Sequence, residues 1–282
     1  MIAVSIVLVL CSGLAHAVWN MFAKQSTDKA VFLWAIYAPS TIVLLPVLIE
    51  ELAGSRFSPR EWLILGASLL MQGIYAFLLG QTYKAGDLSQ VYPIMRGLPT
   101  LLTPAAGVLL LGESLPLWGW IGIACMLIGF VAMVGRHQRT ALASVRPILL
   151  AVGVGLCITT YTLVDKVNLG YMSQLALLEV TSIGFMLGLT PAALKPGRLK
   201  EVIRRHRNIL WLGAILSPGS YLLFLFAART ADVSTVAPLR EVGIVFGTLL
   251  GLLVLKESQG GRRLVASAAV VTGIMMIAIA GH

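Results

Sequence analysis

The sequence predicts an all-α integral membrane protein of about ten transmembrane helices, built as two inverted five-helix repeats. Three observations lead to this prediction. Of the 282 residues, 58% are hydrophobic and only 12% are charged, whereas soluble domains carry about a quarter charged residues. The hydrophobic residues form ten separate runs, each about long enough to cross a bilayer. A pattern of polar and helix-breaking residues in the first half recurs in the second half.

The first half contains five apolar runs bounded by charged or turn-forming residues. The first run ends in Ala15-His16-Ala17, which resembles a signal-peptide cleavage site. No positive charge precedes it, so we expect a retained helix. The next four runs lie between Lys29 and Glu50, between Glu61 and Lys84, between Asp87 and Gly112, and before Arg136. The expected helices cover residues 2–22, 31–49, 62–82, 89–111 and 116–135.

The second half contains five more runs, which are bounded in the same way. They lie between Arg146 and Lys166, before Lys195, between Arg207 and Arg229, between Asp232 and Lys256, and after Arg263. The expected helices cover residues 147–165, 171–193, 209–228, 233–255 and 264–281. Backbone N–H and C=O groups inside the bilayer must form hydrogen bonds within the protein, which only helices and closed β-barrels achieve. These runs lack the alternation of apolar and polar residues that barrel strands show, so helices are expected throughout.

The net charge of +9 does not point to nucleic acid, because the basic residues lie in short connectors between apolar runs. Such residues set membrane topology. The three cysteines, Cys11, Cys125 and Cys157, lie inside apolar runs without a CxxC or Cys/His spacing. Neither a metal site nor a cofactor is therefore expected. The expected partners are a small-molecule substrate and the lipid bilayer, and the oligomeric state is not predicted.

The internal repeat is clearest where Gly86–Pro93 (GDLSQVYP) aligns with Ala231–Pro238 (ADVSTVAP). Further along, Leu110–Ser114 (LLGES) aligns with Val254–Ser258 (VLKES). We therefore predict two domains, residues 1–140 and 141–282. Because five crossings is an odd number, the second copy is inverted in the membrane. Secondary carriers with this arrangement bind substrate between the repeats, near the bilayer midplane.

The sequence resembles the drug/metabolite transporter superfamily in its ten-helix EamA-type form. The resemblance rests on Ala17-Val18-Trp19-Asn20 with Lys24, on the proline-containing starts of the fourth and ninth helices, and on Glu113 and Glu257 at their ends. The resemblance implies a carrier in the cytoplasmic (inner) membrane. It leaves the substrate open, because the superfamily moves amino acids, sugars, nucleotide sugars and drugs. The string His16–Asn20 also resembles a subgroup associated with phosphonate utilisation.

Two arginines lie deep in predicted helices. Arg96 and Arg240 each lie about two turns into a helix of the corresponding repeat position, and an ionisable group there costs at least about 2.5–3.5 kcal/mol. Guanidinium groups suit a carboxylate, phosphate or phosphonate, which predicts an anionic or zwitterionic substrate. Alternatively, Arg96 pairs with Glu241 and only holds the two repeats in register. Glu241 could also neutralise Arg240 or exchange a proton during transport.

Helix-breaking residues accompany each arginine. Pro93 and Gly97 lie near Arg96, while Pro238 and Gly243 lie near Arg240. Proline and glycine loosen a helix and free backbone groups for a ligand. We therefore expect a hinge at both places.

Other residues could line the cavity. His16, Trp19 and Asn20 share one face of the first helix, although His16 could merely bond a neighbouring helix. Four tyrosines could bind substrate or only pack, and the repeat places the first of them near the last. These are Tyr75, Tyr92, Tyr161 and Tyr221.

The remaining charges are expected to be structural. Lys24, Asp165 and Lys166 are expected to be anchors at helix ends, and Glu113 and Glu257 are expected to end their helices and pair locally. The segment Lys195–Arg207 could be a basic interfacial helix or a topology determinant. The connector charges place both termini outside the cytoplasm, whereas the family resemblance implies cytoplasmic termini.

The sequence carries no motif of a membrane enzyme. HExxH, GxSxG and P-loop motifs and acidic clusters are all missing, so a transporter is predicted and not an enzyme. The alternative is a membrane enzyme or lipid-handling protein that acts on a phosphorylated headgroup through Arg96 and Arg240.

Overall fold

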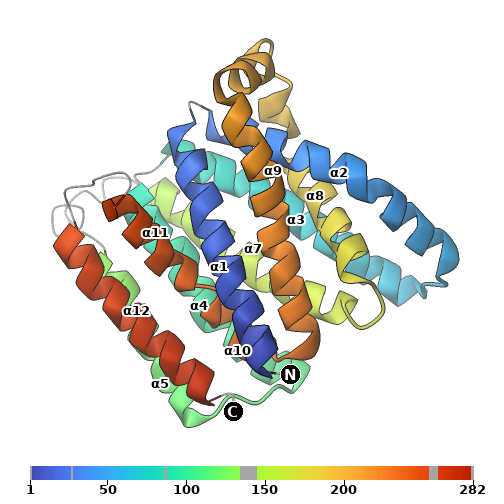
Figure 1. Ribbon diagram of the computed structural model, residues 1–282. Helices are drawn as coiled ribbons and strands as arrows, with labels where there is room; N and C mark the ends of the chain where they lie inside the picture. Colours follow the sequence, from blue (N-terminus) through green and yellow to red (C-terminus); the bar gives the residue numbers. More distant parts are fainter. Residues whose placement is uncertain (1, 27, 86–87, 134–144, 254–259, 281–282) are drawn as a thin grey trace.

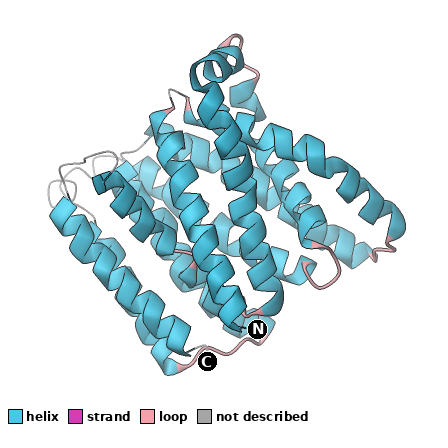
Figure 2. Ribbon diagram, viewed as in Figure 1, coloured by secondary structure: helices cyan, strands magenta, loops and turns pink. Residues whose placement is uncertain are grey.

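The computed structural model describes residues 2–26, 28–85, 88–133, 145–253 and 260–280. Over these residues the chain consists of helices and short turns, without strands (Figure 2). The helices are α1 (Ile2–Gln25), α2 (Lys29–Gly54), α3 (Pro59–Ala85), α4 (Leu88–Leu111), α5 (Leu117–Met133), α7 (Val145–Asn168), α8 (Gln174–Ala193), α9 (Arg198–Thr230), α10 (Val233–Leu239), α11 (Val242–Leu253) and α12 (Gly260–Ala280).

The helices match the ten predicted membrane segments. Eight apolar stretches in the described residues have the length and composition to cross a membrane, one of them formed by α10 and α11 together. Leu117–Met133 and Leu264–Ala280 are apolar but shorter. Large apolar side chains such as Leu109, Ile42 and Leu253 are 75–80% exposed, as lipid-facing residues are. The predicted all-α membrane fold is confirmed.

Two segments differ from the prediction. Helix α9 begins at Arg198 and not near residue 209, with a kink at His206 (φ −121°, ψ 20°). Its first turns therefore form a basic extension in which Arg204, Arg205 and Arg207 are exposed. The ninth predicted helix is divided into α10 and α11.

The helices pack with an internal symmetry (Figure 1). Helices α5 and α12 pair at one edge of the bundle, and α2 packs on α8 at the other edge. Between the edges, α1 packs on α9 and α11, while α7 packs on α3 and α4. If the first five segments are exchanged with the last five, the α5–α12 and α2–α8 pairings map onto themselves, and the two pairings of α1 turn into the two pairings of α7. Two copies of a five-helix unit would pack in this way.

Helices α3 and α8 approach each other closely through glycine. A Cβ atom on Gly188 would lie 2.1 Å from the carbonyl oxygen of Gly73, which no side chain can tolerate without moving a backbone. Small residues allow such contact between membrane helices, where van der Waals packing drives association.

Replacing Gly188 by valine is therefore expected to lower the stability of the protein by about 1–3 kcal/mol, the usual cost of overpacking. Thermal unfolding in detergent would measure the loss. Gly66→Val is the matched control, because a Cβ atom on Gly66 meets nothing within 4 Å. Equal unfolding temperatures for the two variants would contradict the tight α3–α8 contact.

Candidate functional site

The break between α10 and α11 positions the candidate site. Pro238 has no N–H to continue the helical ladder, and the amides of Glu241, Gly243 and Ile244 bond three residues back in the chain, at 2.9–3.2 Å. This tighter bonding satisfies the backbone at the break. Arg240 and Glu241 occupy the break itself.

Glycine permits helix α1 to pass close to the break. A Cβ atom on Gly243 would lie 3.0 Å from the carbonyl oxygen of Gly13, and one on Gly13 would lie 2.5 Å from Val242. The expected hinge at Pro238 and Gly243 therefore coincides with an interruption of the helix. At Pro93 and Gly97 the structure differs from the expectation, because α4 continues through both residues and through Pro99 and Pro104.

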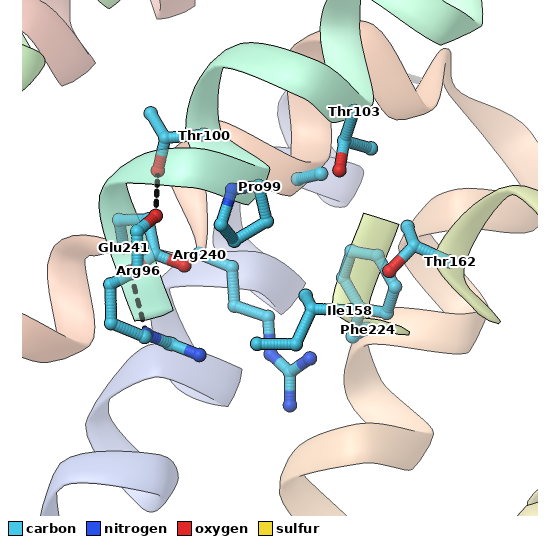
Figure 3. Close-up of a pocket in the computed structure, with 10 residues that line it drawn as sticks. Arg96, Pro99, Thr100, Thr103, Ile158, Thr162, Phe224, Arg240 and Glu241 are labelled. Atoms are coloured by element: carbon cyan, nitrogen blue, oxygen red, sulfur yellow. Dashed lines mark hydrogen bonds and ion pairs between the residues drawn. The ribbon is translucent and has the colours of Figure 1, made fainter. Parts of the chain in front are cut away.

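A small cavity lies beside the break (Figure 3). Helices α4, α7, α9 and the α10–α11 junction all contribute to it. Its lining residues are Arg96, Pro99, Thr100, Thr103, Ile158, Thr162, Phe224, Ala237, Arg240 and Glu241. Both predicted intramembrane arginines thus lie on one cavity, together with three threonine hydroxyls and a carboxylate.

Arg96 forms an ion pair with Glu241. Nε of Arg96 lies 2.9 Å from Oε2 of Glu241, and both side chains are about nine-tenths buried. The contact joins α4 to the helix break, and it is an ion pair without the alignment of a hydrogen bond. This is the pairing that the sequence left as an alternative. Glu241 does not pair with its chain neighbour Arg240 among the described residues.

Arg240 has no carboxylate partner in the part of the chain that the structure describes. Its Nε is buried and makes no hydrogen bond. Its guanidinium carbon lies 5.1 Å from the ring centre of Tyr221 and 4.9 Å from that of Phe224. Such cation–π contacts contribute about 0.5–2 kcal/mol. A guanidinium that lies over two rings at a cavity wall remains able to donate hydrogen bonds to a ligand.

The predicted site residues on helix α1 lie near the cavity arginines but do not line the cavity. His16 lies edge-on to Trp19, with ring centres 5.0 Å apart, and it interacts electrostatically with Arg96 and Arg240. Trp19 is buried, and its Nε1 has no hydrogen-bond partner. The side-chain amide of Asn20 donates a hydrogen bond to the backbone carbonyl oxygen of His16 at 3.0 Å, so this bond lies within α1. None of the three lines the cavity.

Three of the four predicted tyrosines form a continuous row. Tyr75 contacts Tyr161 with ring centres 5.4 Å apart, and Tyr161 contacts Tyr221 at 6.1 Å. The repeat places Tyr75 near Tyr221, and in the structure Tyr161 lies between these two rings. Tyr92 lies one helical turn before Arg96 and interacts with it electrostatically.

Asp165 is the residue for which sequence reasoning was furthest wrong. It was expected to be an anchor at a helix end, but it is 1% exposed. Its carboxylate accepts hydrogen bonds from the hydroxyls of Ser68 and Tyr221. The helical spacing Ile158, Thr162, Asp165 places it on the cavity side of α7, and this spacing could have revealed it.

Two other charged residues tie the helices together. Lys166 donates to the carbonyl oxygens of Ala228 and Ala231 at 2.6 and 2.9 Å, which caps α9. Glu113 accepts from the amides of Val233 and Ser234 at 2.9 and 2.8 Å, so its partner lies across the bundle and not locally. Lys24 and Glu257 have side chains outside the described residues.

Comparison with known proteins identifies the family. Residues 145–279 match the EamA-like transporter family. The spermidine export protein MdtI of Enterobacter sp. (strain 638) is 32% identical over 98 residues, which are 35% of this chain and 86% of the relative. The chain belongs to the EamA-like transporter family. An uncharacterised transporter from the cobO 3′ region of Sinorhizobium sp. is 32% identical to this EamA-type chain over 96 residues, which are 32% of the chain and 67% of the relative.

The fold agrees with this assignment. A protein of known crystal structure superposes with a TM-score of 0.76 over 98% of the EamA-type chain and 97% of its own, at 14% identity. The predicted placement in the drug/metabolite transporter superfamily is confirmed, and the chain is a multi-pass membrane transporter. Its relatives are named as transporters and give no support to the alternative of an enzyme acting on lipid headgroups. The phosphonate-related subgroup stays a prediction.

Proposed function

We propose that this transporter moves a small anionic or zwitterionic metabolite, of the amino acid or organophosphonate type, across the cytoplasmic membrane. Alternating access of the cavity between two inverted repeats, residues 1–140 and 141–282, would carry the substrate across. The observation that carries the proposal is Arg240, a cation at the cavity wall with no carboxylate partner among the described residues.

The charges at the cavity favour an anion. Arg96 and Glu241 neutralise each other, so Arg240 leaves one net positive charge. A carboxylate or phosphonate would neutralise it and accept its N–H donors. The hydroxyls of Thr100, Thr103 and Thr162 could bond the remaining polar groups, including an ammonium group.

The same charges argue against transferring the substrate of the MdtI relative to this chain. That protein is named for spermidine export, and spermidine is a polycation. A polycation would lie beside an unpaired guanidinium, where like charges repel. The relative also matches only about a third of this chain. The family likeness therefore supports transport, while the substrate class rests on the cavity.

The symmetric pairing of helices supports alternating access. Glu241 of the second proposed repeat pairs with Arg96 of the first at the cavity wall, and Glu113 of the first caps α10 of the second. In inverted-repeat carriers, one repeat rocks against the other around the substrate. Contacts between the repeats beside the site are those that such a movement would change.

Exchange in proteoliposomes tests the proposal. Purified protein would be reconstituted and loaded in turn with unlabelled glutamate, alanine, 2-aminoethylphosphonate, phosphate or spermidine, and counterflow of the same labelled compound would be measured. We expect saturable counterflow of at least one anion or zwitterion and none of spermidine. Counterflow of spermidine alone would overturn the proposed substrate class and leave the family assignment intact.

A further inference from the structure

We propose that Asp165 is a proton-binding site that couples substrate movement to a proton gradient. The inference rests on the proposed function and adds its energy source. The group would take a proton from water on one side of the membrane, hold it as a neutral carboxylic acid, and release it on the other side. On protonation an O–H bond of a hydronium ion breaks as an O–H bond of the Asp165 carboxyl forms, and on release the reverse occurs.

The surroundings of Asp165 favour reversible protonation. Its carboxyl is buried near the end of α7 and has two hydroxyl partners, Ser68 on α3 and Tyr221 on α9, the latter at 2.5 Å. It forms no ion pair in the described part of the chain. The adjacent Lys166 is directed to the carbonyl oxygens at the end of α9. A buried carboxylate without a cation is costly, so the neutral form is accessible.

Several charged and titratable groups on the helices packed against α7 are engaged with other partners, among them Arg229 on α9, which donates to the carbonyl oxygen of Met172 at 3.0 Å. On α3, Tyr75 contacts Tyr161 of α7 itself. On α4, Arg96 is paired with Glu241. At the end of α10, Arg240 lies over Tyr221 and Phe224 of α9. None of these groups is within ion-pairing distance of Asp165.

Hydroxyl partners can serve both protonation states. Serine and tyrosine hydroxyls donate to a carboxylate, and each can also accept from a carboxylic acid. Asp165 therefore keeps hydrogen bonds whether or not it carries a proton. Glu241, the carboxyl that the sequence suggested for proton exchange, is held by the guanidinium of Arg96. A proton on Glu241 would leave that buried guanidinium unpaired, so Asp165 is the better proton carrier.

Tyr221 links the proton site to the substrate site. Its hydroxyl bonds Asp165, and its ring lies against Arg240. An anion that binds Arg240 would draw the guanidinium from the ring and change the position of the hydroxyl. Because a proton and an anion carry opposite charges, their binding to neighbouring sites is mutually favourable. The expected coupling is therefore movement of proton and substrate together.

Two measurements on the same proteoliposomes test this role. The first is counterflow of labelled 2-aminoethylphosphonate, or of the panel compound that exchanges, at equal pH on both sides. The second is accumulation of that compound when only the outside is acidic. For Asp165→Asn we expect counterflow within about threefold of wild type, and loss of the gradient-driven accumulation to the level without a gradient. Glu50→Gln, which alters an exposed carboxylate on α2, is the matched control and should keep both activities.

A second variant covers the case in which Asp165→Asn fails to fold. Ser68→Ala removes one hydroxyl partner and keeps the carboxyl, so we expect the pH at half-maximal accumulation to shift from the wild-type value. Accumulation that does not respond to pH in wild type, an unshifted pH profile in Ser68→Ala, or full gradient-driven accumulation by Asp165→Asn would each overturn the role of Asp165. Lack of counterflow by the wild type with every compound would instead overturn the proposed function, and this inference with it.

Discussion

Replacing Arg240 by glutamine is expected to lower kcat/KM for exchange of the anionic or zwitterionic substrate by about a hundredfold. A hydrogen bond to a charged group contributes about 1.5–3 kcal/mol, and each 1.4 kcal/mol corresponds to a factor of ten. Arg240 supplies both a positive charge and hydrogen-bond donors, and no carboxylate among the described residues pairs with its guanidinium. Arg96 cannot substitute for it, because its guanidinium is engaged by Glu241.

Initial rates of counterflow over a range of substrate concentrations would measure the loss. Arg240→Lys keeps the charge but not the planar fork, so an intermediate loss is expected. Arg204→Gln is the control, because it removes an exposed guanidinium from the basic extension of α9. Normal KM and kcat in Arg240→Gln would remove Arg240 from the substrate site.

Much of the fold could be predicted because the bilayer constrains it. Each crossing needs about 20 apolar residues, and charges that bound the runs mark the connectors. For Lys195–Arg207 the sequence left open a basic interfacial helix or a topology determinant, and the segment is helical from Arg198. Its continuation into the next membrane helix could not be predicted, because residues 198–208 are mostly polar and hydropathy does not show whether a polar segment continues a helix. Similarly, proline alone does not mark a broken helix. Helix α4 continues through three prolines, while a break occurs at Pro238, where α1 approaches through Gly13.

The candidate site was predicted where residue type alone is unusual. Arg96 and Arg240 stand out in apolar runs, and the structure brings both to one cavity. Their partners depend on neighbouring helices, which a sequence does not give. One expectation could have been refined, because adjacent residues on a helix do not face each other, and Glu241 was therefore poorly placed to neutralise Arg240. Asp165 was missed because Lys166 follows it, and this charged pair looked like the end of a membrane segment.

The Arg96–Glu241 pair is expected to have a large effect on stability. Loss of one partner leaves the other charge buried and unpaired, which costs about 3–5 kcal/mol. Arg96→Met and Glu241→Met should therefore each lower the unfolding temperature in detergent by about 10 °C. The double variant removes both charges together and should recover most of that loss, since apolar replacements of a buried pair are often neutral.

The exposed pair of Arg198 with Asp28, at 2.8 Å, provides the matched control. Because exposed pairs contribute about 0–1 kcal/mol, Arg198→Met should change the unfolding temperature by no more than about 2–4 °C. Additive losses in the Arg96→Met/Glu241→Met variant would contradict the pairing.

Exchange by the same double variant separates the two roles that the sequence left open for Arg96. With Arg240 intact, the cavity still carries one net positive charge, so exchange is expected to stay within about tenfold of wild type if Arg96 only joins the repeats. A double variant that is as stable as wild type but exchanges as poorly as Arg240→Gln would instead place Arg96 beside the substrate. We expect the first result, because the side chain of Arg96 is already bound by the carboxylate of Glu241 at the α10–α11 break, while that of Arg240 is bound only by aromatic rings.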